Sequence, residues 1–73
     1  MLEKLKEILV EEMQISEDTI KMEATLREDL GMNSIELSEL VLICEEKFGI
    51  EIDEEIAKDF VTVKDVVDYL ETL

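Results

Sequence analysis

The sequence contains no histidine, no proline and no tryptophan, and it has a single cysteine. The absence of histidine removes the imidazole of Ser-His and Cys-His catalytic pairs, and it removes a common nitrogen ligand of zinc. Cys44 has no second cysteine with which to form an internal disulfide, and no positively charged, apolar leader opens the chain. No apolar run approaches the roughly 20 residues that a membrane-spanning helix needs. We therefore expect a protein of the reducing cytoplasm that is not inserted in a membrane.

Basic residues are also scarce: 7 lysines and arginines stand against 21 aspartates and glutamates, for a net charge of −14. Such a field repels the phosphates of nucleic acid and the headgroups of anionic lipids. It attracts proteins that carry a basic patch and speeds their encounter. The acidic residues lack the spacing of a calcium-binding loop, so we expect no specific metal site. The composition disfavours nucleic acid as a partner and favours basic protein surfaces.

What the sequence does contain is enough apolar surface for one small core. The chain has 73 residues, of which 47% are apolar and only two are glycine. A chain of this length does not divide into several cores, so we expect a single domain over residues 1–73. With no proline and few glycines to interrupt helices, the composition favours a compact all-α fold.

The first part of the chain is predicted to form one helix and a long loop. Residues 2–13 place their apolar side chains at steps of three and four, which predicts an amphipathic helix. Residues 14–30 are spaced too irregularly for a helix, and we expect an ordered loop. Within it, residues 16–18 look like a cap or turn and residues 25–30 like a short helical turn.

A second helix is predicted to begin at Asn33-Ser34, because both side chains can cap a helix. It runs to about Phe48, after which Gly49 is a typical C-cap. The helix therefore begins directly behind the turn that Gly31 introduces.

Two further helices follow. Residues 53–58 are predicted to form a short third helix, whose first turn carries acidic residues that favour the helix dipole. Thr62 and Asp65 have the spacing of a capping box and open a fourth helix with a valine-rich apolar face. The expected fold is a four-helix bundle with three longer helices, one short helix and a long first loop.

The predicted second helix has two distinct faces. At about 100° per residue, one arc is wholly apolar and should be buried: Leu37, Leu40, Val41, Cys44 and Phe48. The opposite face alternates two large apolar side chains with two carboxylates: Ile35, Glu39, Leu42 and Glu46. This mixture suits a docking surface, because carboxylates orient a basic partner and apolar side chains supply the buried contact. A solvated face with incidental apolar residues is the alternative interpretation.

Three roles are open to Ser34, at the start of this helix. As an N-cap it would accept backbone N–H bonds and contribute about 1 kcal/mol. As a catalytic nucleophile it lacks a histidine base, and the sequence places no lysine to replace one. As a modification site it suits a phosphodiester, which would lie at the positive end of the helix dipole near unpaired N–H groups.

Three stretches of the chain together resemble the acyl carrier protein family. They are EDLGMNSIEL at residues 28–37, EEKFGIEI at residues 45–52 and TVKDVVDYL at residues 62–70. The resemblance implies that Ser34 matches the serine of the family's Asp-Ser-Leu motif and receives 4′-phosphopantetheine from coenzyme A. A holo-carrier-protein synthase with magnesium would make the transfer. The thiol of the arm would then hold growing fatty-acyl chains as thioesters for successive enzymes of fatty-acid biosynthesis.

The same resemblance implies a docking surface and an acyl site. Its acidic residues, which would dock on basic patches of the partner enzymes, are Glu36, Glu39, Glu45 and Glu46. Its apolar contacts would be Ile35 and Leu42. The core beneath the second helix would open to shelter the acyl chain, at residues such as Leu40, Cys44, Phe48 and Val66. The protein would act as a monomer and would not be an enzyme.

The motif departs from the family pattern at two positions. Asn33 stands where the family has aspartate, and Ile35 stands where it has leucine. Because asparagine caps a helix well, the departure concerns recognition by the synthase rather than the fold. Two alternatives stay open: a specialised carrier for polyketide or aminoacyl cargo, and an acidic interaction module that is never modified.

Overall fold

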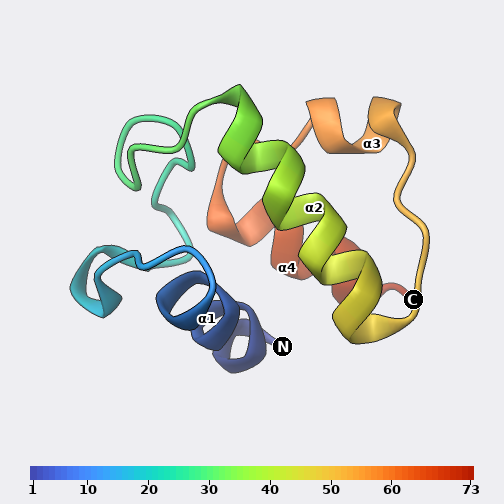
Figure 1. Ribbon diagram of the computed structural model, residues 1–73, viewed down its shortest axis with the longest axis horizontal. Coiled ribbons are helices and arrows are strands. Elements are labelled where there is room, and N and C mark those ends of the chain that lie inside the picture. The colour runs from blue at the N-terminus through green and yellow to red at the C-terminus, as the bar shows by residue number, and fades with distance from the viewer.

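The computed structural model describes residues 1–73 and contains four α-helices and no β-strand. The elements, labelled in Figure 1 where there is room, are α1 (Leu2–Glu11), a 3₁₀ turn η1 (Glu17–Thr19), α2 (Ser34–Phe48), α3 (Glu54–Lys58) and α4 (Val63–Glu71). The predicted bundle of three longer helices, one short helix and a long first loop is confirmed. None of these helices combines the length and the apolar composition that a membrane crossing requires.

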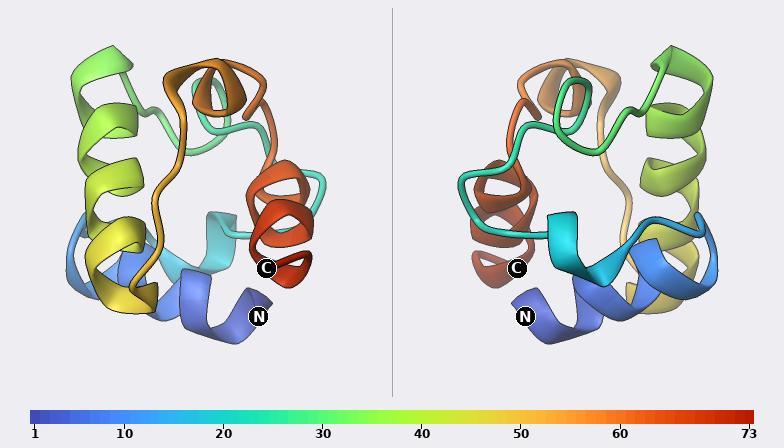
Figure 2. Two further views of the ribbon diagram at one scale, coloured as in Figure 1. Left: turned by 90° about the vertical axis from the view of Figure 1, so that its right-hand side faces the viewer. Right: turned by 90° about the vertical axis from the view of Figure 1, so that its left-hand side faces the viewer.

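The helices form a closed ring around one core. Figure 2 shows α2 and α4 on opposite sides of the molecule, with α1 across one end and α3 across the other. The two termini lie close together, because α1 begins where α4 ends, and the N-terminal ammonium of Met1 is 3.8 Å from the carboxylate of Glu71. This arrangement leaves one long side of α2 facing solvent.

The core is made only of apolar side chains, and no polar or charged residue is buried. The helices and the loops contribute Leu5, Ile8, Leu9, Ile20, Ala24, Leu26, Met32, Leu40, Cys44, Ile52, Val63, Val66, Val67 and Leu70. On α2, the predicted buried arc is confirmed: Leu40 and Cys44 are 2% and 1% exposed, and its other members are half-buried against the same core.

The first helix is shorter than predicted. It ends at Glu11, and residues 12–13 belong to a turn. The chain reverses at Gln14, which adopts a left-handed φ of 57°, and the Ile15 N–H then donates to the Leu9 carbonyl at 3.0 Å. This hydrogen bond closes the helix end and turns Ile15 back onto the core, which apolar spacing alone did not indicate.

The long first loop is ordered by pairing with the start of α4. Thr25 forms an isolated antiparallel bridge with Thr62. On one side of this bridge the carbonyls of Ala24 and Met22 accept the N–H groups of Val63 and Lys64, at 3.0 and 2.9 Å. These two N–H groups lie in the first turn of a helix and have no partner within it, so the loop supplies acceptors that α4 lacks.

The predicted caps of the later helices are confirmed. Thr62 and Asp65 form both bonds of a capping box at the start of α4. Gly49 ends α2 in the left-handed conformation, with φ 64° and ψ 41°. α3 begins at Glu54, one residue after the predicted start, because Asp53 is its N-cap residue.

Candidate functional site

The site begins at the N-terminus of α2, where Asn33 is the capping residue. Its Oδ1 accepts the Glu36 N–H at 2.8 Å, and the Asn33 N–H donates to Glu36 Oε1 at 3.1 Å. Ser34 is therefore the first residue of the helix, and of the three roles open to it the role of N-cap belongs to Asn33 instead. The sequence contained the deciding signal, because Asn33 has a glutamate three residues later whereas Ser34 has Leu37.

Freed from capping, the Ser34 side chain is exposed to solvent. Its Oγ accepts a hydrogen bond from Arg27 Nη2 at 3.1 Å. A guanidinium donates protons and cannot accept one, so Arg27 cannot act as a general base for this hydroxyl. The geometry thus agrees with the prediction that Ser34 has no activating base.

The backbone around Ser34 offers donors that the chain does not use. The N–H groups of Ser34 and Ile35 lie in the first turn of α2 and donate to no other group of the chain. In α4, by contrast, the corresponding N–H groups of Val63 and Lys64 are both accepted by loop carbonyls. The start of α2 can therefore accommodate a negatively charged group on the serine oxygen.

Arg27 is a functional candidate that sequence reasoning missed. It lies in the segment predicted as a short helical turn, which the structure confirms as a single closed turn: Asp29 N–H and Leu30 N–H both donate to the Thr25 carbonyl at 3.1 Å. The turn points the Arg27 side chain at Ser34, seven residues along the chain. No spacing rule relates two such residues, because their contact depends on the shape of the turn.

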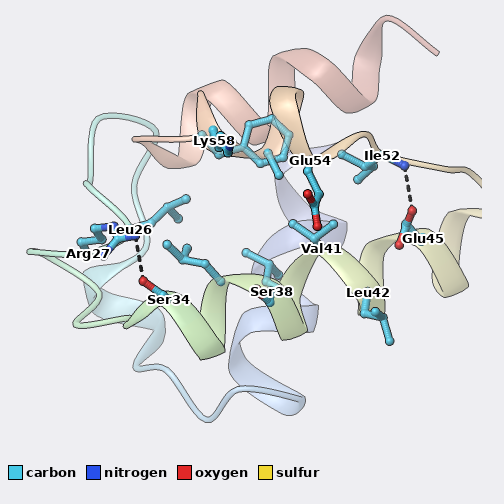
Figure 3. Close-up of a pocket in the computed structure, with 14 residues that line it drawn as sticks. Leu26, Arg27, Ser34, Ser38, Val41, Leu42, Glu45, Ile52, Glu54 and Lys58 are labelled. Carbon is cyan, nitrogen blue, oxygen red and sulfur yellow. Dashed lines mark hydrogen bonds between the residues drawn. The ribbon is translucent and has the colours of Figure 1, made fainter.

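A pocket of about 500 Å³ opens beside Ser34 and runs between α2 and α3. Figure 3 shows the Ser34 side chain at one end of this pocket, next to Arg27. The apolar part of its wall is formed by Leu26, Leu37, Leu40, Val41, Leu42, Ile52, Ala57 and Phe60. Its volume lies within the range of roughly 300–1,000 Å³ that is usual for ligand pockets.

Polar side chains surround this apolar wall. They are Arg27, Ser34, Ser38, Glu45, Glu54 and Lys58. The carboxylate of Glu54 points from α3 toward Val41 (Figure 3). The pocket therefore has an apolar interior and a charged opening, which suits a chain that is apolar along its length and polar where it is attached.

The acyl site implied by the resemblance coincides with this pocket only in part. Leu40 lines it, but Cys44, Phe48 and Val66 do not. Cys44 and Val66 lie in the core, each 1% exposed, and Phe48 lies at the far end of α2 beside a smaller groove against α1. Besides α2 and the first loop, the pocket is lined by α3 and the segments on either side of it, whose fold over α2 the helical wheel did not describe.

The solvent side of α2 carries the predicted mixed face. Ile35 and Leu42 are 71% and 58% exposed, which is unusual for large apolar side chains. Glu39 and Glu46 lie on the same face and are both exposed. The helical wheel therefore identified the exposed face of α2 correctly.

The two other acidic residues assigned by resemblance have structural partners. Glu36 belongs to the capping box with Asn33. Glu45 is half-buried, and its Oε2 accepts the Ile52 N–H at 2.8 Å, which ties α2 to the segment before α3 (Figure 3). Both carboxylates lie beside the exposed face rather than within it.

Cys44 lies outside the site. Burial, and to a lesser extent the neighbouring Glu45 charge, raises the pKa of its thiol from 9.0 to about 11. The thiol is therefore neutral and inaccessible, as expected of a cysteine that serves as a small apolar side chain. No group of three or more histidine, cysteine, aspartate or glutamate side chains is arranged to hold a metal ion.

In this arrangement an exposed serine without a base stands between the mixed acidic and apolar face of α2 and an apolar pocket. Residues 3–70 match the family model described as "Phosphopantetheine attachment site". The chain is 43% identical over 68 residues to an acyl carrier protein of Nitratidesulfovibrio vulgaris strain DP4, covering 93% of this chain and 90% of the relative. It is 44% identical over 70 residues to an acyl carrier protein of Clostridium perfringens strain 13, covering 96% and 92%. The chain belongs to the acyl carrier protein family.

Proposed function

We propose that Ser34 is the residue on which this protein holds its 4′-phosphopantetheine. As a member of its family, the protein carries acyl chains as thioesters on this covalent cofactor in fatty-acid synthesis. The proposal rests on the position of Ser34. This serine is the first residue of α2, its side chain is exposed, and it lies at one end of the apolar pocket. We further propose that residues 1–73 act as one carrier domain without catalytic activity of their own.

The surroundings of Ser34 fit a phosphodiester. The N–H groups of Ser34 and Ile35 are free to donate to it, and the Arg27 guanidinium supplies a positive charge. Gly31 leaves open space, because a side-chain carbon added there would meet no heavy atom within 4 Å. An incoming enzyme can therefore approach the serine without first displacing a side chain at this position.

In the transfer step, the Ser34 Oγ forms a bond to the phosphorus of coenzyme A that bears the pantetheine. The bond from that phosphorus to the bridging oxygen breaks, and adenosine 3′,5′-bisphosphate leaves. The serine proton passes to a base of the synthase, because Arg27 cannot accept it. Ser34 is thus the acceptor of a group transferred by another enzyme, which explains why a serine without histidine is sufficient.

The sequence Asn33-Ser34-Ile35 stands in place of the family's Asp-Ser-Leu, and we propose that the asparagine affects recognition. Asn33 already makes the capping contact that the fold needs, through Oδ1. An aspartate would make the same contact and add a negative charge beside the serine. The change from aspartate to asparagine therefore affects the charge that the synthase meets beside the serine, and not the capping of the helix.

We propose that partner enzymes with basic patches dock on the exposed face of α2. Ile35 and Leu42 supply the apolar contact and Glu39 and Glu46 the outer charge, with Glu36 and Glu45 at the edges of the same surface. Exposed apolar residues that are flanked by charge are typical of an interface, and the net charge of −14 speeds the encounter. We expect the protein to act as a monomer in the cytoplasm, where the single cysteine stays reduced.

The test of the attachment site uses purified protein, coenzyme A, magnesium and a broad-specificity phosphopantetheinyl transferase. The intact mass should increase by one phosphopantetheinyl group, and Ser34→Ala should abolish the increase. Ser38→Ala is the matched control, because Ser38 is exposed, lies one turn further along α2 and lines the same pocket. An unmodified wild-type mass, or modification that persists in Ser34→Ala, would contradict the proposal and favour an unmodified interaction module.

The docking surface is tested by charge reversal. Glu39→Lys should raise the KM of the synthase for the carrier, whereas Glu23→Lys, an exposed carboxylate in the first loop, should change it little. Equal effects of the two variants would mean that only the net charge matters. Identification of the thioester on protein purified from its source separates a fatty-acyl cargo from a polyketide or aminoacyl one.

A further inference from the structure

We propose that Arg27 is a positioning residue that binds the phosphodiester of the phosphopantetheine arm and directs the arm along the pocket. The inference rests on the proposed attachment at Ser34. The evidence for this role is the contact between Arg27 and Ser34, which the folded turn creates. Arg27 is the single arginine of the chain.

The charge of Arg27 is available in a protein that has little positive charge to spare. The chain forms three ion pairs, which involve the N-terminus, Lys6 and Lys64. Arg27 is in none of them, although 21 acidic residues compete for 7 basic ones. Its guanidinium donates instead to the neutral hydroxyl of Ser34. An anion bound to that hydroxyl would be the first negatively charged partner of this side chain.

The geometry of the existing contact favours a phosphate oxygen. Arg27 Nη2 is 3.1 Å from Ser34 Oγ, and this oxygen becomes an ester oxygen once the arm is attached. The non-bridging oxygens of the phosphodiester then lie one bond beyond the phosphorus and carry the negative charge. A planar guanidinium presents several N–H donors in a fork that matches such oxygens, which a lysine ammonium does not. The hydrogen bond therefore passes from Oγ to these oxygens with little movement of Arg27.

The backbone that carries Arg27 is held in place on both sides. Leu26 is 1% exposed in the core, and its N–H donates to the Val61 carbonyl at 2.8 Å. The turn is further closed by Asp29, whose carboxylate accepts the Thr25 N–H at 2.8 Å. A side chain on such a turn needs to order only its own rotamers in order to bind, so the entropy cost of binding is small.

Binding of the phosphodiester would orient the rest of the arm. Arg27 and Ser34 both line the end of the pocket that lies between the loop and α2, and the apolar wall continues from there toward α3 (Figure 3). With the phosphate held at one end, the pantetheine lies along the groove rather than projecting at random into solvent. Lys58 also lines the pocket, but it lies on α3 and forms no hydrogen bond with Ser34, so it serves as a matched control.

The experiment compares the apo and phosphopantetheine-loaded protein by NMR, after intact mass has shown that loading at Ser34 is complete. Because the chain has one arginine, its side-chain Nε–Hε signal is unambiguous. We expect this signal to shift downfield when the wild type is loaded. In the loaded Arg27→Gln variant the ³¹P resonance of the arm should differ from that of the loaded wild type, whereas in loaded Lys58→Gln the two should coincide. Arg27→Lys should restore the ³¹P shift only partly, because it retains the charge and loses the fork.

The outcomes separate the inference from the proposed function. Complete loading with an unchanged arginine signal, or equal ³¹P shifts in the Arg27→Gln and Lys58→Gln variants, would overturn the role of Arg27 and leave Ser34 as the attachment site. Failure of the wild type to load would overturn both. If Arg27→Gln itself does not load, the arginine signal of the loaded wild type still decides. The exposed position of Arg27 predicts that the circular dichroism of the apo variants is unchanged.

Discussion

Replacement of Asn33 by alanine tests the finding that Asn33, and not Ser34, caps the helix that carries the attachment site. The substitution removes Oδ1, which accepts the Glu36 N–H at 2.8 Å. The Glu36 N–H is near solvent, so water can replace the lost acceptor in part, and the cost is that of an exposed cap. We expect the free energy of unfolding to fall by about 1 kcal/mol, within a usual range of about 0.5–2 kcal/mol.

For a domain of this size, 1 kcal/mol corresponds to a decrease in Tm of about 4–8 °C. The measurement is thermal unfolding followed by far-ultraviolet circular dichroism, with urea unfolding as a second determination of the free energy. Asn33→Asp keeps the acceptor and adds a negative charge at the positive end of the helix, which is worth about 0.3–1 kcal/mol. The neighbouring Glu36 and the net charge of −14 oppose this gain, so we expect a Tm close to that of the wild type.

Ser34→Ala is the control that makes the result decisive, because its hydroxyl accepts no backbone N–H and bonds only to an exposed arginine. We expect its Tm to change by much less than that of Asn33→Ala. If Ser34→Ala were the more destabilising of the two, the assignment of the cap would be refuted. Because Asn33→Asp leaves stability nearly constant, any change in its rate of loading by the synthase measures recognition alone.

Three further predictions concern pH and salt. Burial, together with the Glu45 charge, raises the pKa of the Cys44 thiol from 9.0 to about 11, so the folded state holds its proton more tightly. Stability should fall as the pH rises through this interval, by roughly 3 kcal/mol. In urea unfolding Cys44→Ala should remove this part of the slope, and an unchanged slope would contradict the cause. Hydrogen bonds from the backbone of Thr62 and Val61 lower the pKa of Asp65 below 3.8. Its contribution to stability should therefore be present at neutral pH and lost as the pH falls below about 4. Asp65→Asn should reduce the loss of stability with falling pH, and Asp68→Asn is the control. Because repulsion among 21 acidic residues is screened by salt, Tm should rise with added NaCl or MgCl₂, and a flat response would show that this repulsion costs little stability.

Much of the fold was predictable because short-range rules decide it. The helical spacing, the capping box of Thr62 and Asp65, and the left-handed Gly49 all depend on residues within a few positions of one another. The end of α1 was predicted two residues too late, because it depends on a left-handed Gln14, a conformation that residues other than glycine adopt only uncommonly. Apolar spacing predicts which face of a helix is buried, whereas the last residue of the helix depends on the backbone conformation of the residues that follow.

The candidate site divides in the same way. The exposure of Ile35 and Leu42 followed from the helical wheel, and Ser34 followed from its position behind Gly31. The contact of Arg27 with Ser34 and the bond of Glu45 to Ile52 could not be predicted, because each joins residues seven positions apart across a change of direction in the chain. The pocket likewise depends on how α3 folds over α2, which no local pattern specifies.

The pairing of the first loop with the start of α4 has a consequence for when the serine can be loaded. The turn that presents Arg27 is attached to the rest of the fold by the Leu26 bond to the Val61 carbonyl, so it reaches its final position only after that part of the chain is available. A chain still emerging from the ribosome would expose Ser34 on a segment whose preceding loop has no partner. We therefore expect a chain truncated before Val61 to be a poor substrate for the synthase even though its serine motif is intact.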